Sequence, residues 1–564
     1  MLRMLRMLAR FSLVALVAGA AGTAGAQGNS VTADLILTNG RIYTVDETRP
    51  VVEAVAVAGG KVLFAGNAAG ALALKGPATR VVDLAGRVVI PGMVDAHAHV
   101  GGLGDALHIV DLTGTASYDE VVARVAARAK LLPKGQWVLG RGWDQNDWGD
   151  TRFPTHDKMT AAVPDHPVYV VRVDGHAGLA NLTAMQAANV TAATQDPSGG
   201  HMERTADGSP AGVFVDNAQG LVRRAIPRQT RDEVKTALVD AVKEAQRWGL
   251  TGAHDAGADA TTLDVYEELA KAGQLKFRLY AMVSDDAKTV DAWFKRGPLV
   301  AGYNGSLWVR SIKLYADGAL GSRGAALLEP YSDDPKNIGL LVSAPAHIQE
   351  VATRALKAGF QVNTHAIGDR GNRLVLDAYE AALKAVPTAD HRFRVEHAQI
   401  LHYDDIPRFA ALGVIPAMQA SHQTSDMYWA GTRLGSVRLL GAYAWRSLLN
   451  TGVVIPNGSD FPVEQVNPLI SFHSAVSRQD AHDWPPGGWY PAERMTRDEA
   501  LKSVTIWPAY AAFQEKVLGS LTPGKYADFV VLDQDIMRCP AELILRTRVL
   551  STWVGGERVY EAVP

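Results

Sequence analysis

The sequence contains one cysteine, Cys539, in 564 residues. No intrachain disulfide can form and a cysteine-based zinc site is excluded, so any metal must be held by histidines, carboxylates or a rarer group. An excess of one charge is also lacking, because 56 Lys and Arg stand against 59 Asp and Glu, for a formal net charge of -3. This balance offers no basic stripe and predicts that nucleic acid is not a partner.

The sequence also lacks long apolar runs, and the clearest apolar stretch is a short one near the N-terminus. Three arginines precede an apolar run at residues 11–18, and small residues follow at 24–26. This order is typical of a secretory signal peptide at residues 1–26. An uncleaved anchor is the alternative interpretation. We therefore expect a periplasmic or secreted protein with no stable membrane insertion after cleavage.

A dinucleotide-binding motif, G-x-G-x-x-G, is missing from every predicted strand-to-helix turn. Its absence disfavours an open doubly wound sheet, the main competitor for a chain whose strand-like and helix-like segments alternate. The alternation between residues 88 and 510 predicts an α/β fold with a closed (β/α)8 TIM-type barrel. The strand-like runs lie at 88–100, 250–257, 277–284, 309–318, 360–369, 393–400, 414–422 and 453–460.

Both ends of the chain are rich in short β-like segments joined by glycine turns. We expect residues 33–87 and 511–564 to form one composite β-sandwich beside the barrel. About 150 residues separate the first two barrel runs, far more than one crossover needs. We therefore expect an insertion after barrel strand 1, at about 112–235, that covers the barrel mouth and shapes the substrate pocket.

The strongest local signal is the pair His97 and His99 in the segment DAHAH. Residues two apart on a strand face the same side, so both side chains point into the barrel and could bind one metal ion. Taken alone, the pair could equally be two histidines packed on one strand face. Other ligand-type residues end further predicted strands, and a barrel gathers such ends around one axis. They are Lys313, His365, His397 and Asp460.

These residue types predict hydrolysis assisted by a divalent ion. His97 and His99 would hold one ion, and His365 and His397 would hold a second or complete the first. The ion would lower the pKa of bound water and polarise a carbonyl group. Asp460 would be a ligand and also the catalytic base, which takes the proton of the attacking water and passes it to the leaving amine.

Lys313 is an awkward ligand as a bare ammonium, because its charge would repel the ion. Carboxylation would turn its amine into an anionic carbamate that bridges two ions. The alternatives are an unmodified lysine that pairs with Asp317, or one that stabilises an oxyanion.

Four further residues are candidates for substrate binding. His422 follows the seventh predicted strand, and Trp143 and His176 belong to the expected insertion. Arg323 could bind a carboxylate through two parallel hydrogen bonds or could simply orient its own loop. A structural role is the alternative for each of the four.

Six segments together resemble a known family: PGMVDAHAH, IKLYADGALGSR, THAIGD, RVEHAQ, NGSDFPVE and LTPGKYADFVVLD. They resemble the amidohydrolase superfamily and, more narrowly, its amidohydrolase-3 branch of YtcJ-like and N-substituted formamide deformylase-like proteins. The resemblance runs from about Asp34 to the C-terminus. It implies a distorted (β/α)8 barrel with a composite β-sandwich.

The resemblance also implies a ligand set and an activity. The implied ligands are His97, His99, His365, His397, Asp460 and a carboxylated Lys313, around one or two divalent ions with zinc as the first choice. The expected reaction is hydrolysis of a C–N bond in a small amide, formamide or cyclic amide. Esters, lactones or N-acyl amino acids are alternative substrates for the same site, and a non-catalytic exported binding protein is the alternative class. The retained Asp460 favours the enzyme. Homo-oligomerisation is left open.

Overall fold

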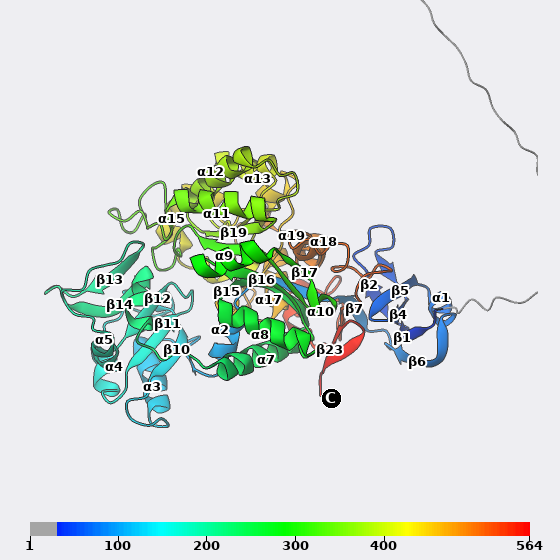
Figure 1. Ribbon diagram of the computed structural model, residues 1–564, viewed down its shortest axis with the longest axis horizontal. Coiled ribbons are helices and arrows are strands. Elements are labelled where there is room, and N and C mark those ends of the chain that lie inside the picture. Colours follow the sequence, from blue (N-terminus) through cyan, green and yellow to red (C-terminus); the bar gives the residue numbers. More distant parts are fainter. Residues whose placement is uncertain (1–30, 564) are drawn as a thin grey trace, which may run out of the picture.

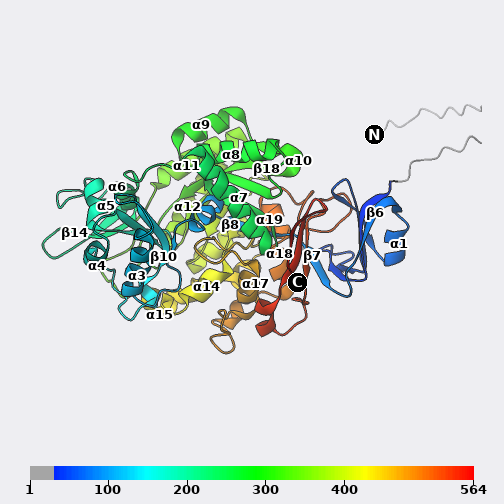
Figure 2. The ribbon, with the colours of Figure 1, turned by 90° about the horizontal axis from the view of Figure 1, so that it is seen from below.

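The computed structural model describes residues 31–563. The predicted signal peptide at 1–26 lies outside the described residues. Figures 1 and 2 show three parts in a row, with a lobe at one end, the barrel in the middle and sheets from both chain ends at the other. Within residues 31–563, no helix combines the length and the apolarity that a bilayer crossing requires.

Seven parallel strands form a nearly closed barrel wall. Around the wall they are β21 (Ile415–Ala417), β20 (Arg394–His397), β19 (Gln361–Ala366), β18 (Leu307–Tyr315), β16 (Arg278–Ser284), β15 (Leu250–Ala258) and β8 (Met93–Ala98). A short strand, β17 (Leu299–Ala301), pairs with β18 outside this path. Every residue of β8, β19, β20 and β21 is buried, as expected for parallel strands covered by helices.

The eighth predicted strand, at 453–460, is not a strand, and the structure corrects this part of the prediction. Residues 456–461, which we call the closing segment, instead bridge the gap between β21 and β8 with irregular backbone. Two backbone hydrogen bonds mark the bridge: Met418 N–H to Pro456 O at 3.1 Å and Ala96 N–H to Asn457 O at 3.2 Å.

Backbone conformation explains why the closing segment is not a strand. Asp460 has a φ of 62°, which an extended strand cannot contain, and its N–H donates to the carbonyl of His97 at 2.7 Å. Gly458 approaches β8 so closely that a Cβ would lie 2.4 Å from the backbone nitrogen of His97. The segment therefore closes the wall only because glycine stands at this position.

Strands from both ends of the chain share one six-stranded sheet. Its order is β24 (Glu557–Glu561), β23 (Val549–Val554), β22 (Phe529–Leu532), β7 (Val88–Pro91), β2 (Arg41–Tyr43) and β3 (Val51–Val52). A second sheet has the order β5 (Lys61–Gly66), β4 (Ala54–Ala58), β1 (Ala33–Thr38) and β6 (Lys75–Asp83). Leu35 and Val55 of the second sheet share one buried cluster with Phe529 and Trp553 of the first. The predicted run at 88–100 thus divides between this sheet and the barrel.

Residues 110–216 form a lobe with its own sheet between β8 and β15 in the chain. The sheet order is β13 (Gly200–Arg204), β14 (Pro210–Asp216), β12 (Ala177–Ala180), β11 (Val168–Arg172), β10 (Val138–Trp143) and β9 (Val110–Asp111). Helix α3 (Tyr118–Ala129) covers this sheet and begins after Ser117, whose side chain accepts from the N–H of Glu120. We call this unit the β9–β14 lobe.

Helices lie between the barrel strands, as the alternation of strand-like and helix-like segments predicted, and two of them have clear start or stop signals. Helix α7 (Arg231–Arg247) begins with a capping box in which the Thr230 and Glu233 side chains each accept from the other's backbone N–H. Helix α11 (Pro345–Ala358) begins with proline and ends at Gly359 in the left-handed conformation.

Candidate functional site

A cavity of about 710 Å³ opens at the carboxyl ends of the barrel strands, between the barrel and the β9–β14 lobe. The barrel side of its wall contains His99, Lys313, His365, His397, His422 and Asp460, and the lobe side contains Arg141, Asp144, Arg172, Asp174 and His176. Barrel enzymes carry their sites at this face.

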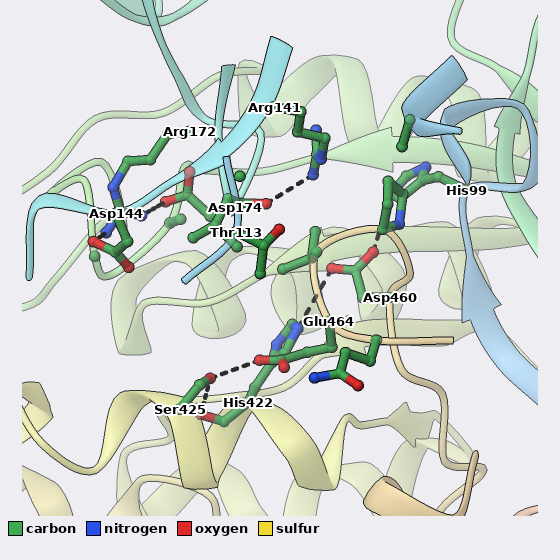
Figure 3. A pocket seen from close by; sticks show the side chains of 18 of the residues that line it. His99, Thr113, Arg141, Asp144, Arg172, Asp174, His422, Ser425, Asp460 and Glu464 are labelled. Atoms are coloured by element: carbon green, nitrogen blue, oxygen red, sulfur yellow. Dashed lines mark hydrogen bonds and ion pairs between the residues drawn. The ribbon is translucent and has the colours of Figure 1, made fainter. Parts of the chain in front are cut away.

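Asp460 is the centre of a tight histidine cluster (Figure 3). Its Oδ1 lies 3.0 Å from Nε2 of His99 and 3.5 Å from Nε2 of His97. Side-chain ligand atoms of His97, His397 and Asp460 all lie within 4.8 Å of one another, and the three residues are buried. Lys313 joins them, with Nζ 3.5 Å from Nε2 of His97.

His365 lies at the edge of this cluster. Its ring centroid is 4.5 Å from that of His397 and 5.0 Å from that of His176, which belongs to the lobe. Asp317, the partner considered above for an unmodified Lys313, is used differently. Its buried carboxylate accepts from three backbone N–H groups, at 2.8 to 3.0 Å, and lies 3.7 Å from Nε2 of His365. The structure thus brings five of the six predicted ligands together and places the sixth beside them.

Two residues of the cluster have unusual backbone conformations. His397 has a φ of 74° and Asp460 a φ of 62°. Positive φ costs a non-glycine residue about 1 kcal/mol or more, and such residues persist only where their surroundings hold them. The site therefore carries local strain at two positions where side-chain direction matters.

Glu396 is a site residue that sequence reasoning missed. It is fully buried, forms a short contact with Nδ1 of His97, and lies 2.7 Å from Nε of Arg394. Because Glu396 occupies Nδ1, the other ring nitrogen of His97 is directed at Asp460. The available signal was the alternation in RVEH, which places two charged residues on one face of a buried strand.

Burial dominates the electrostatics of the cluster. It lowers the pKa of His97 to about 4, and the pKa values of His365 and His397 also lie well below the ordinary range. Burial alone would raise the pKa of Asp460, but its interactions with His97, His99 and His397 hold it well below its usual value. At neutral pH the site therefore offers neutral imidazoles and a carboxylate. Burial also lowers the pKa of Lys313 to about 8, which brings its amine closer to neutrality.

The β9–β14 lobe contributes His176, in the loop after β11. Its Nδ1 lies 2.5 Å from Oδ1 of Asp216, and its carbonyl accepts from the Asp216 N–H at 2.8 Å. Burial opposes protonation, but the Asp216 carboxylate outweighs it and raises the pKa of His176. This pair turns a lobe histidine toward the barrel histidines.

The structure places the other predicted substrate residues differently. His422 lines the cavity, with Nε2 3.8 Å from Oδ2 of Asp460. Trp143 is fully buried in the lobe core, where its indole N–H donates to the carbonyl of Val170 at 2.9 Å. Arg323 pairs with Asp333 at 2.8 Å. Neither Trp143 nor Arg323 lines the cavity, which corrects their expected position.

Comparison with known proteins identifies the family. The amidohydrolase family model matches residues 80–560. The chain is 34% identical over 529 residues to putative amidohydrolase YtcJ of Bacillus subtilis, covering 93% of this chain and 98% of that one. It is 29% identical over 549 residues to N-substituted formamide deformylase of Arthrobacter pascens, covering 94% and 98%. The crystal structure of an uncharacterized metal-dependent hydrolase from Pyrococcus horikoshii superposes with a TM-score of 0.73 at 26% identity, covering 90% and 99%.

The chain therefore belongs to the amidohydrolase family and is a hydrolase of that family. This confirms the resemblance that the six sequence segments indicated.

Proposed function

We propose that this protein hydrolyses a C–N bond other than a peptide bond, in an amide, formamide or cyclic amide, with one or two divalent ions. The observation that carries the proposal is the convergence of histidines, Lys313 and Asp460 in the wall of one cavity, with the buried His97 directly beside them. Family membership supports hydrolysis, and the similarity to N-substituted formamide deformylase supports a C–N bond as the target.

The residues present fit a divalent cation. Neutral imidazoles and a carboxylate are ligand types that zinc and similar ions prefer. Oδ1 of Asp460 is buried and accepts no hydrogen bond of acceptable geometry within residues 31–563, although two histidine nitrogens lie within 3.5 Å of it. That arrangement suits a shared cation better than a hydrogen-bonded network. The proposed ligands of the first ion are His97, His99, His397 and Asp460. His365 and a carboxylated Lys313 are the proposed additional ligands of a second ion.

The bound ion would supply Lewis-acid polarisation of the substrate carbonyl and a water nucleophile at neutral pH. Asp460 is the proposed base that holds the water proton on its carboxylate and returns it to the leaving nitrogen. His422 flanks Asp460 on one side and His99 flanks it on the other, so the carboxylate has a fixed direction. His176 and His422 are the proposed substrate contacts.

We also propose two features of the architecture and one of localisation. The two end sheets, from 33–87 and 511–564, would form one composite β-sandwich, and their shared buried cluster supports this. The β9–β14 lobe would be an insertion, at about 112–235, that covers the barrel mouth, and its contribution to the cavity wall supports this. Residues 1–26 would direct export to the periplasm or the medium.

The decisive experiment combines metal analysis with Asp460→Asn. Elemental analysis of purified protein should find one or two divalent ions per chain. Turnover of N-formyl and N-acyl amines by the metal-loaded variant should fall by at least about 1,000-fold while metal stays bound. Asp165→Asn is the matched control, because Asp165 forms an exposed pair with Lys134. Metal-free protein with no response to zinc, or activity that survives Asp460→Asn, would contradict the proposal. Extra mass on the amine of Lys313 in metal-loaded protein would show its carboxylation.

A further inference from the structure

Arg141 lies on the lobe side of the cavity without a carboxylate partner. It belongs to β10, lines the cavity, and forms no ion pair within 4.0 Å among residues 31–563. Its Nη2 donates to the carbonyl of Val173 at 2.8 Å, and its buried Nε finds no hydrogen-bond partner among the described residues. Most of the five N–H donors of this guanidinium thus have no acceptor in the part of the chain that the structure describes.

The neighbouring arginine shows what a satisfied guanidinium in this wall looks like. Nη1 of Arg172 lies 2.5 Å from Oδ2 of Asp174, and Nη2 forms a short contact with Asp144. Its Nε donates to Oε1 of Gln145 at 2.8 Å. Arg172 is therefore fixed and neutralised by protein groups alone, whereas Arg141 is not.

The unneutralised cation needs an anion from elsewhere. Arg141 is partly buried, and proteins normally pair a guanidinium that is partly removed from water with a counter-ion. The two carboxylates that act most strongly on Arg141 already have other partners, since Asp174 pairs with Arg172 and Asp460 belongs to the histidine cluster. Burial lowers the pKa of Arg141, as expected for a cation that its surroundings do not fully compensate.

The position of Arg141 restricts where the anion would lie. Figure 3 shows its guanidinium on the His99 side of Asp460, while His422 and Glu464 lie on the opposite side. Glu464 is held by the Ser425 hydroxyl at 2.7 Å and would repel an anion from that side. A planar guanidinium with free donors matches a carboxylate in two parallel hydrogen bonds.

We propose that Arg141 binds a carboxylate of the substrate, so that the preferred substrates are amides or formamides bearing a carboxylate close to the cleaved C–N bond. This inference rests on the proposed C–N hydrolysis and narrows its substrate class. It also moves the carboxylate-binding role considered for Arg323 to an arginine that faces the cavity.

The test uses a pair of probes that differ only in the carboxylate: N-formylphenylalanine and N-formylphenethylamine. Metal-loaded wild-type enzyme should prefer the first by about 100-fold in kcat/KM, the size expected for a charge-assisted bidentate contact. Arg141→Met should remove that preference, because kcat/KM for the first probe should fall by about 100-fold more than kcat/KM for the second. Arg141→Lys, which keeps the charge without the fork, should restore part of the preference. Arg323→Met is the control and should leave it intact.

Calorimetric binding of N-acetylphenylalanine, measured without turnover, separates this inference from the proposed function. If both formyl probes are cleaved and Arg141→Met affects them equally, the inference is overturned while C–N hydrolysis stands. If neither is cleaved but wild-type protein binds N-acetylphenylalanine and Arg141→Met does not, the carboxylate site stands and the proposed reaction fails. Equal binding by wild type and Arg141→Met also overturns the inference, and unchanged metal content and melting temperature show that the variant is folded.

Discussion

Oδ1 of Asp216 lies 2.5 Å from Nδ1 of His176, and Oδ2 of the same carboxylate packs against the barrel loop after β18. A Cβ on Gly318 would lie 2.4 Å from that oxygen, and one on Gly324 would lie 2.5 Å from it. The carbonyl of Gly318 in turn lies 3.5 Å from Nε2 of His365. His176, a proposed substrate contact, and His365, a proposed metal ligand, are therefore both positioned by packing around Asp216.

Asp216→Asn tests whether this support matters for turnover. The substitution keeps the shape but removes the charge that fixes the His176 ring, so kcat for an N-formyl amine should fall by about 10- to 100-fold. Metal content should not change. Asp196→Asn is the control, because Asp196 forms a comparable pair, at 3.1 Å, with the exposed His201 of the same lobe. An unchanged kcat in Asp216→Asn would show that His176 needs no such orientation.

Gly318→Ala tests the close approach itself. The added methyl group would overlap Oδ2 of Asp216, so the free energy of unfolding should fall by about 1–3 kcal/mol, the usual range for overpacking. Gly149→Ala offers a matched comparison, since no atom of residues 31–563 beyond its chain neighbours lies within 4 Å of its Cβ position. Urea denaturation measures both. Equal stability of the two variants would mean that the loop moves aside without cost.

Glu396→Gln removes the anion between Arg394 and His97. It leaves a fully buried guanidinium without its counter-ion, so the free energy of unfolding should fall by about 3–5 kcal/mol. Metal affinity should weaken by about 10- to 100-fold, because the ring of His97 loses its anchor. Glu380→Gln is the control, because it weakens only surface pairs with Lys384 and Arg408, and it should change the free energy of unfolding far less. Chemical denaturation and zinc titration check the two effects, and a stable, tightly metallated Glu396→Gln would refute both.

Acid stability should depend on Glu499. The carboxylate of Glu499 accepts hydrogen bonds from Arg446 and Thr496, and these lower its pKa from the ordinary 4.5 to about 2. A lowered carboxyl pKa stabilises the fold above pH 4.5, and this contribution is lost as the pH falls from about 4.5 to about 2. Because the side chain is partly exposed, about 1 kcal/mol is expected after solvent screening. Denaturation of wild type and Glu499→Gln across this range should show the variant with the flatter pH dependence. Parallel curves would contradict the assignment.

The sequence could predict the features that follow from local periodicity. His97 and His99 share a strand face, and Lys313, His365 and His397 stand near the ends of hydrophobic runs, so a barrel had to gather them. The closing segment could not be predicted, because the apolar run at 453–455 just before it resembles a strand and only the contacts of the segment with β8 force Asp460 to a positive φ. Glu396 was missed because its contact with His97 joins two strands that are far apart in the sequence, although its pairing with Arg394 on the same strand could have been read from RVEH. Arg323 and Arg141 look alike in the sequence, and only their partners distinguish them.

The closing segment also determines how this enzyme would fail. The residue proposed as its base stands not on a strand but on six irregular residues that complete the barrel wall. If the hydrogen bonds between the closing segment and β8 weakened, Asp460 would move while the seven strands of the barrel wall stayed paired. Damage at this seam, from heat or from substitutions around Gly458, should therefore produce inactive molecules that still look native by circular dichroism. Turnover would therefore detect damage to the barrel wall earlier than circular dichroism, which reports only its secondary structure.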